Sequence, residues 1–240
     1  DLDLVYIYDD PEQDAAENYS RLGQRLNTWL SSQTSAGILF ETDLRLRPNG
    51  DAGLLAVSIE SFRRYQLENA WIWEHQALSR ARFVAGDAAV GRRFEEIRCE
   101  ILCRERNLAK LREEVLAMRQ KMLDAHASKS SDEFNLKEDP GGIIDVEFIV
   151  QYLVLGHACR FRQLTGNLGN IALLAIAADC GLIDRADADA SRIAYREYRR
   201  LQHLNRLNDR PKALLPRAGL QMHIAAVQKL WGIVFESLPK

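Results

Sequence analysis

The sequence has few of the residues that mark a secreted, disulfide-rich or zinc-binding chain. Its 240 residues include four cysteines and five histidines. No cysteines form a Cys-x-x-Cys pair and no two histidines are four residues apart, so the spacing favours neither a zinc site nor a disulfide framework. We interpret Cys99, Cys103, Cys159 and Cys180 as reduced thiols, which predicts a cytoplasmic protein.

The sequence also lacks a long apolar run and an excess of charge of one sign. Its longest apolar-rich stretch, residues 170–183, is interrupted by Asp179 and is shorter than the roughly 20 residues that span a bilayer. The 32 Lys and Arg residues nearly balance the 34 Asp and Glu residues, which gives a formal net charge of −2. Such a chain has no general attraction to nucleic acid or anionic membranes, and neither is expected as a partner.

The sequence predicts a mixture of strands and helices in its first part and mostly helices after residue 87. β-Branched and aromatic residues predict strands over 2–8 and 37–47 and a short third strand over 80–86. Helical spacing predicts helices over 17–32, 58–65 and 71–78. From residue 87 onward nearly every segment has helical spacing, apart from a short extended segment at 134–137 and a proline-containing loop at 211–216. The helices predicted there cover residues 91–103, 108–126, 144–159, 169–180, 187–207 and 221–236.

These patterns predict a mostly helical α+β fold. A small sheet with helices is expected in a first domain, residues 1–106, and an all-helical bundle in a second, residues 107–240. The chain starts with Asp-Leu-Asp-Leu rather than Met, and we interpret it as a fragment from which an upstream part is missing.

Charged residues alternate with leucines on the first two predicted strands. Asp1 and Asp3 are two residues apart, so both point to one face of their strand. By the same rule Asp43, Arg45 and Arg47 share a face of the second strand. If the strands are neighbours, three carboxylates converge, which is unfavourable unless a cation lies between them.

Magnesium suits such a site because it takes hard oxygen ligands and leaves room for phosphate oxygens. Two such ions can hold the attacking and leaving oxygens of a phosphoryl displacement, and Arg45 and Arg47 can bind phosphate. The same residues also fit solvated strand faces or an edge strand protected by charge, so this pattern alone leaves the alternatives open.

Several motifs in a fixed order resemble one family. Residues 1–6, Asp-Leu-Asp-Leu-Val-Tyr, and residues 41–50, Glu-Thr-Asp-Leu-Arg-Leu-Arg-Pro-Asn-Gly, are similar to the nucleotidyltransferase core of the glutamine synthetase adenylyltransferases. The resemblance covers the chain well to about residue 170 and more loosely to its end, and it implies that the small sheet of the first domain is of the nucleotidyltransferase type. It continues through Tyr65-Gln66, Trp-Glu-His-Gln-Ala-Leu at 73–78, Arg-Ala-Arg at 80–82, Lys137, and Gly-Gly-Ile-Ile-Asp-Val-Glu-Phe at 141–148.

This resemblance implies transfer of AMP from Mg-ATP to a tyrosine of glutamine synthetase, which regulates nitrogen assimilation. It implies two Mg²⁺ ions bound by Asp1, Asp3 and Asp43, with Asp43 also helping the tyrosine hydroxyl to lose its proton. A phenol needs such help because its pKa is near 10. The implied partners are glutamine synthetase, the PII signalling protein and the effector glutamine.

The family has two related halves, one that adds AMP and one that removes it by phosphorolysis. The Trp-Glu-His-Gln-Ala-Leu run and Asp145 favour the adding, C-terminal half. The removing half of the same enzyme and a non-catalytic docking or regulatory module remain as alternatives. In the family a Gly-Ser-bearing turn that holds the triphosphate precedes the first Asp, and this sequence begins after that point.

Lys137, Asp145 and Glu147 form a second candidate motif around the Gly-Gly pair. The glycines predict the start of a helix, and a helix N-terminus beside a lysine can bind anions. The alternative is a loop lysine followed by acidic residues that the helix dipole favours in the first turn.

Overall fold

The structure, a computed structural model, describes residues 2–126, 132–208 and 214–236. Its contacts divide the chain into two compact units, Asp1–Ile101 and Leu102–Lys240. Helices dominate and the strands form small two-stranded sheets, which confirms the predicted α+β, mostly helical class. Within the described ranges, no helix has the length and apolar character to cross a bilayer. The division into domains after residue 106 stays a prediction.

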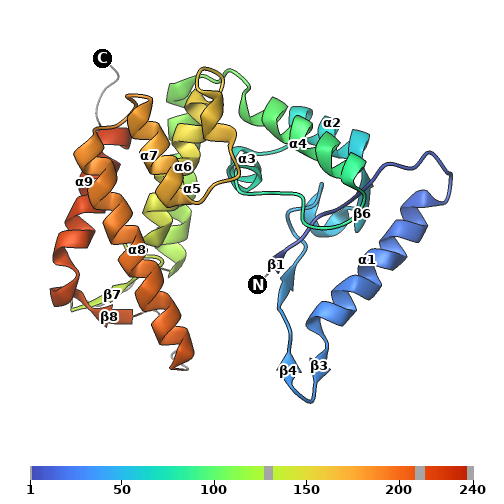
Figure 1. Cartoon of the computed structure of the whole chain (residues 1–240), viewed down its shortest axis with the longest axis horizontal. Helices are drawn as coiled ribbons and strands as arrows, with labels where there is room; N and C mark the ends of the chain where they lie inside the picture. The colour runs from blue at the N-terminus through green and yellow to red at the C-terminus, as the bar shows by residue number, and fades with distance from the viewer. Residues whose placement is uncertain (1, 127–131, 209–213, 237–240) are drawn as a thin grey trace. The chain divides into compact units, whose positions relative to one another are not determined.

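Among its described residues, the first unit has parallel strand pairs and a hairpin, whose strands β3 and β4 are labelled in Figure 1. β1 (Leu2–Asp3) pairs with β5 (Thr42–Asp43), and β2 (Tyr6–Tyr8) pairs with β6 (Ala56–Ser58). β3 (Gln33–Thr34) and β4 (Gly37–Ile38) form the antiparallel hairpin. Each of the two long predicted strands is therefore broken into shorter ones. The strand predicted at 80–86 is wrong, because these residues form a turn and irregular backbone.

The helices of the first unit enclose an apolar core. The core consists of Ile59, Phe62, Leu78, Phe94, Ile97 and Ile101. α1 packs closely on β2, since a Cβ added at Gly23 would lie 3.1 Å from a ring carbon of Tyr6. The helices are α1 (Ala15–Ser31), η1 (Gly50–Ala52), α2 (Ile59–Glu68), α3 (Ile72–Leu78) and α4 (Ala88–Leu102).

A break between β1 and β2 changes which side of the chain is buried. Val5 and Ile7 pack against the core, whereas Asp3 is exposed. An unbroken strand would place these three residues on one face. The irregular backbone at Leu4 and Val5 therefore allows a carboxylate to face solvent immediately before a buried strand.

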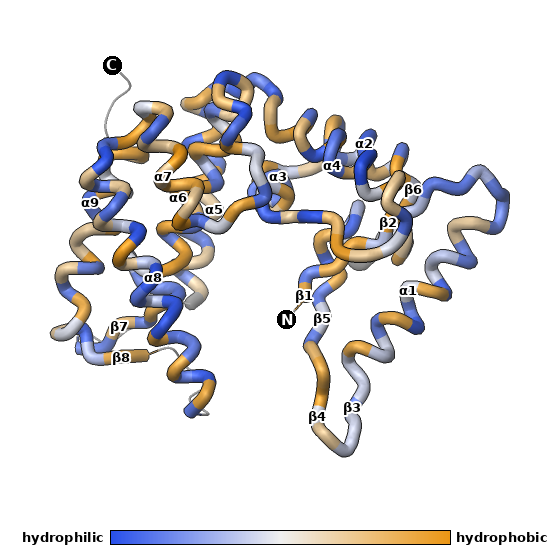
Figure 2. Tube along the Cα trace, viewed as in Figure 1, coloured by the Kyte–Doolittle hydropathy of each residue, from blue (hydrophilic) through white to orange (hydrophobic). Residues whose placement is uncertain are grey.

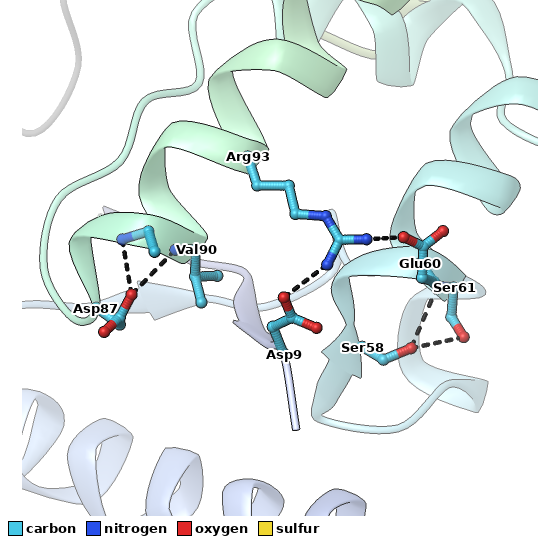
Figure 3. Close-up of polar contacts among 8 residues, drawn as sticks. Asp9, Ser58, Glu60, Ser61, Asp87, Val90 and Arg93 are labelled. Carbon is cyan, nitrogen blue, oxygen red and sulfur yellow. Dashed lines mark hydrogen bonds and ion pairs between the residues drawn. The ribbon is translucent and has the colours of Figure 1, made fainter. Parts of the chain in front are cut away.

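Arg93 on α4 joins the end of β2 to the start of α2 (Figure 3). Its Nη1 lies 2.6 Å from Oδ2 of Asp9, and its Nη2 pairs with Glu60. Ser58 caps α2 by accepting a hydrogen bond from the backbone amide of Ser61 at 3.2 Å, as serine commonly does at this position. The ends of the parallel pair β2–β6 are thus held to α4.

Among the described residues of the second unit, α5, α7, α8 and α9 pack around the central α6. α6 is buried along nearly its whole length, and its apolar residues can be followed in Figure 2. β7 (Glu133–Asn135) and β8 (Leu214–Pro216) form an antiparallel pair. β7 overlaps the extended segment predicted at 134–137, and β8 adds to this otherwise helical part a strand that was not predicted. The helices are α5 (Leu108–His126), α6 (Ile143–His157), α7 (Asn170–Asp179), α8 (Arg185–Leu207) and α9 (Gln221–Phe235), with short η2 (Arg162–Thr165) and η3 (Arg217–Gly219).

Candidate functional site

The parallel pair β1–β5 places Asp3 beside Asp43. The register aligns Leu2 with Thr42 and Asp3 with Asp43, and the amide of Leu4 donates to the Asp43 carbonyl at 2.8 Å. Aligned residues of neighbouring strands point to the same side of a sheet. The two carboxylates therefore share one face, while Asp1 lies outside the described residues.

The carboxylate of Asp43 is bound by Arg45. Nε of Arg45 lies 3.0 Å from Oδ1 and 2.9 Å from Oδ2, its Nη2 also bonds Oδ2, and its backbone amide donates to Oδ1 at 2.8 Å. These hydrogen bonds hold the pKa of Asp43 below its ordinary value because they stabilise the charged form. Asp43 is therefore ionised at neutral pH, which suits a cation ligand and makes it a weak proton acceptor.

Arg45 and Arg47 do not lie on the strand, so the predicted face shared with Asp43 is wrong. β5 ends at Asp43, and both arginines lie in the turns that follow. The Pro-Asn-Gly sequence after Arg47 favours turns over a continued strand. Nη1 of Arg47 donates to the carbonyl of Leu44 at 2.6 Å, and its Nε lies 3.5 Å from the carbonyl of Gly53.

An open hollow lies over the end of β5. Residues of opposite charge line it, and Arg45 forms an ion pair with Asp43 there. The lining residues are Asn27, Glu41, Thr42, Asp43, Leu44, Arg45 and Arg47.

The two carboxylates aligned on the pair β1–β5 fit a hard divalent cation. Within residues 2–126, 132–208 and 214–236, no group of three or more His, Cys, Asp or Glu side chains could hold a metal ion. Asp3 and Asp43 nevertheless supply two carboxylates in register, and carboxylate oxygens are the ligands that magnesium takes. A cation bound there has to share or replace the contact between Asp43 and Arg45.

Asp145, from the second candidate motif, is buried at the start of α6. Nε of Arg119 lies 2.6 Å from Oδ1, and the amide of Gly141 donates to Oδ2 at 2.6 Å. Nη2 of Arg119 donates to the carbonyl of Glu138 at 2.7 Å. Burial raises the pKa of Asp145 although Arg119 opposes the rise. These contacts tie the Gly-Gly turn and α6 to α5.

Lys137 and Glu147 have partners other than Asp145. The Lys137 side chain is 58% exposed, and its Nζ lies 3.6 Å from the Glu138 carboxylate. Glu147 accepts a hydrogen bond from the Tyr195 hydroxyl at 3.3 Å. An anion-binding role for the motif stays a prediction.

Arg119, the partner of Asp145, is not among the site residues predicted from the sequence. A signal was present, because Leu111, Val115 and Arg119 follow one another at four-residue intervals on α5 and all three are buried. An arginine on an otherwise apolar helix stripe needs a partner of opposite charge when it is buried. The spacing indicates such a residue but not which carboxylate it meets.

Two family models match successive parts of the chain. The model described as Glutamate-ammonia ligase adenylyltransferase matches residues 1–97. The model described as GlnD PII-uridylyltransferase matches residues 109–233. The first match contains the aligned carboxylates and the arginine-bearing turns, and the second contains the Gly-Gly turn and α6.

Similar curated proteins match nearly the whole chain. Each of the three described here is named "Bifunctional glutamine synthetase adenylyltransferase/adenylyl-removing enzyme". The relative from Aromatoleum aromaticum is 62% identical over 241 residues, which cover 99% of this chain and 25% of the relative. Those from Chromobacterium violaceum and Neisseria meningitidis serogroup A are 58% and 56% identical, and each alignment covers 98% of this chain and 26% of the relative. The chain thus spans about a quarter of the length of these relatives.

Proposed function

The chain belongs to the glutamine synthetase adenylyltransferase family, and from this premise we propose that it carries the site that adds AMP to glutamine synthetase. The reaction moves AMP from Mg-ATP to a tyrosine of the synthetase and releases pyrophosphate. The observation that supports it best is the register of Asp3 with Asp43, next to a turn that presents two arginines.

The candidate residues have separate parts in this proposal. Asp1, Asp3 and Asp43 would hold two Mg²⁺ ions. When bound, Mg²⁺ shields the triphosphate and lowers the pKa of the attacking phenol, which a carboxylate as weakly basic as Asp43 does not achieve alone. Asp43 accepts the hydrogen bond of the tyrosine hydroxyl and then its proton. Arg45 and Arg47 bind phosphate oxygens.

The proposal includes the partners and the setting. Glutamine synthetase is the protein substrate, PII and glutamine are regulators, and the reaction takes place in the cytoplasm. The match of residues 109–233 to a PII-uridylyltransferase model supports PII as a partner of the helical unit.

The test uses the natural protein that contains this sequence, supplied with Mg²⁺, unmodified glutamine synthetase and ATP labelled at the α-phosphate. Asp43→Asn is expected to lower label transfer by about 10²- to 10⁴-fold, as loss of an essential acid–base group does. Glu17→Gln is the control, because Glu17 is an exposed acid on α1 paired with Arg21. Retained transfer in Asp43→Asn would show that the proposal is wrong.

The same variant separates the two halves of the family. AMP-modified synthetase is incubated with phosphate, and ADP release is measured. Loss of label transfer with retained ADP release supports the adding half. Loss of ADP release with retained transfer assigns this chain to the removing half instead.

A further inference from the structure

A second hollow lies along α1, next to the candidate site. Asn27, which lines the first hollow, follows Gln24 of the second by three residues, and residues three apart are neighbours on a helix surface. The second hollow therefore borders the hollow that contains Asp43. Its lining residues all belong to α1 and are Arg21, Gln24, Arg25, Thr28 and Trp29.

Arg25 supplies an unpaired positive charge to the second hollow. It is exposed, and within the described part of the chain no hydrogen bond or ion pair engages its guanidinium group. Arg21, one turn earlier, instead pairs with Glu17. Residues 18–40 contain these two arginines and no lysine or acid, although the chain as a whole has a net charge of −2. An occupant with an acidic side chain is therefore favoured at Arg25.

Exposed apolar side chains lie on the same end of α1 and on the hairpin β3–β4. The exposed fractions are 66% for Trp29 and 54%, 62% and 46% for Ile38, Leu39 and Phe40. The amide of Phe40 donates to the carbonyl of Leu30 at 3.0 Å, which holds the end of the hairpin against the last turn of α1. In Figure 2 the trace from β4 toward β5 has the colour of hydrophobic residues. Large apolar side chains gathered at one place on a surface are typical of a site that binds another polypeptide.

These apolar residues lead directly to the candidate site. Phe40 is followed in the chain by Glu41, Thr42 and Asp43, which line the first hollow. Three residues span at most about 11 Å, so Phe40 lies within the length of a few extended residues of Asp43. A tyrosine whose hydroxyl reaches Asp43 thus has chain neighbours that can lie over the hairpin and the second hollow.

We propose that a docking surface, formed by Arg25, Trp29, Leu39 and Phe40, binds the segment of the protein substrate that carries the acceptor tyrosine. That segment has an acidic side chain that pairs with Arg25 and apolar side chains that cover the hairpin residues. The inference rests on the proposed function and deepens it, because it names the chemistry of the substrate segment. A nucleotide fits the surface less well, since its single base cannot cover several apolar side chains.

The test measures label transfer by the natural protein at varied concentrations of glutamine synthetase and, separately, of ATP. Arg25→Gln is expected to raise the KM for the synthetase about fivefold, the equivalent of one exposed ion pair. Leu39→Ser is expected to raise it about tenfold, because an apolar contact is lost. The KM for ATP and the kcat are expected to change less than about twofold in both variants, because only binding of the protein substrate is weakened.

Arg64→Gln and Leu204→Ser are the matched controls. Arg64 on α2 is also exposed, and its side chain has no hydrogen bond or ion pair among the residues that the structure describes. Leu204 on α8 is 46% exposed. Both controls should leave the KM for the synthetase unchanged. Added salt should raise this KM more in the wild type than in Arg25→Gln, because salt screens an exposed ion pair, and a merely structural role of Arg25 does not produce this difference.

An exchange of charge tests the pairing of Arg25. Arg25→Glu is expected to raise the KM for the synthetase more than Arg25→Gln does, and a lysine in place of an acidic residue near the acceptor tyrosine should partly restore it. A KM for the synthetase in Arg25→Gln and Leu39→Ser equal to that of the controls overturns the docking role. A lower Tm or a changed oligomeric state in its place assigns the surface to the rest of the natural protein or to a second copy. The proposed function fails on a different result, retained label transfer by Asp43→Asn.

Discussion

Replacing Arg119 by methionine removes the guanidinium group that faces Asp145 and keeps an unbranched stem on the buried side of α5. The side chains of Arg119 and Asp145 are 2% and 6% exposed. In the variant, the carboxylate keeps the amide of Gly141 but loses its only counter-charge among the contacts described above. The Gly-Gly turn also loses the hydrogen bond from Arg119 to the Glu138 carbonyl.

Arg119→Met is expected to lower the free energy of unfolding substantially, because the buried charge of Asp145 is left unpaired. Removing one partner of a buried ion pair typically costs about 3–5 kcal/mol. Nη1 of Arg119 is buried and has no hydrogen-bond partner among the described residues, so the native pair is already incompletely satisfied. This favours the lower end of the range, about 3 kcal/mol. For a chain of this size, the loss corresponds to a fall in Tm of roughly 6–12 °C.

The stability that Arg119→Met loses should be greater at neutral pH than in acid. Burial raises the pKa of Asp145 and Arg119 opposes the rise, so the folded-state pKa rises further in Arg119→Met. A carboxyl whose pKa is higher in the folded state than in the unfolded state stabilises the fold fully at pH values below the unfolded-state pKa. This stabilisation is lost as the pH rises through the folded-state pKa. The deficit of the variant relative to the wild type is therefore full at neutral pH and shrinks in acid, as Asp145 becomes protonated in the variant.

The assay is urea unfolding at pH 7 and pH 5, with amide hydrogen exchange of α5 and α6 to locate the change. Arg185→Met is the control, since Arg185 pairs with Asp179 at the surface, where the side chains are 50% and 62% exposed. Arg185→Met is expected to lower the free energy of unfolding by less than about 1 kcal/mol. The reasoning is refuted if Arg119→Met loses no more stability than Arg185→Met, or if its deficit is as large at pH 5 as at pH 7.

Two further changes test the site and the Gly-Gly turn. Arg45→Gln should raise the pKa of Asp43 toward its ordinary value, because the hydrogen bonds and the charge of the guanidinium are lost while the backbone amide of residue 45 remains; a carboxyl ¹³C NMR titration checks this, and an unchanged pKa contradicts it. Gly141→Ala should cost more than about 1 kcal/mol in urea unfolding, because φ is +91° and the new Cβ would lie 2.9 Å from a side-chain carbon of Ile224. Gly219→Ala is the control, with open space around the new Cβ, and an equal loss in both variants would rule out strain at Gly141.

The helices could be predicted from the sequence because helical amphipathicity is a local property. α5 was predicted at its observed ends, and α1, α6, α7, α8 and α9 differ from their predicted ranges by a few residues at most. Hydrogen bonds four residues apart and a buried stripe with a 3.6-residue period leave a signal in any window of that length. Strands of two or three residues leave almost no such signal, and for this reason β3, β6 and β8 were missed.

The order of motifs was likewise sufficient to indicate the family, because each motif is contiguous in the chain. The carboxylates at residues 3 and 43 were identified in the same way, from strict alternation with leucine. The alternation of charged residues with leucine did not show where the second strand ends. The Pro-Asn-Gly sequence turns the chain earlier than a continued pattern suggests, and this moves Arg45 and Arg47 off the strand.

The sequence by itself therefore determined the helices, the mostly helical class and the residues worth testing. Only the tertiary structure decided which of them meet: Asp3 with Asp43 across a parallel pair, Tyr65 with Glu74, and Arg119 with Asp145. The physical reason is that strand register and the partner of a buried charge depend on chain segments far apart in sequence. The local sequence pattern shows that a charged residue on a buried helix face needs a partner, and tertiary packing determines which residue that partner is.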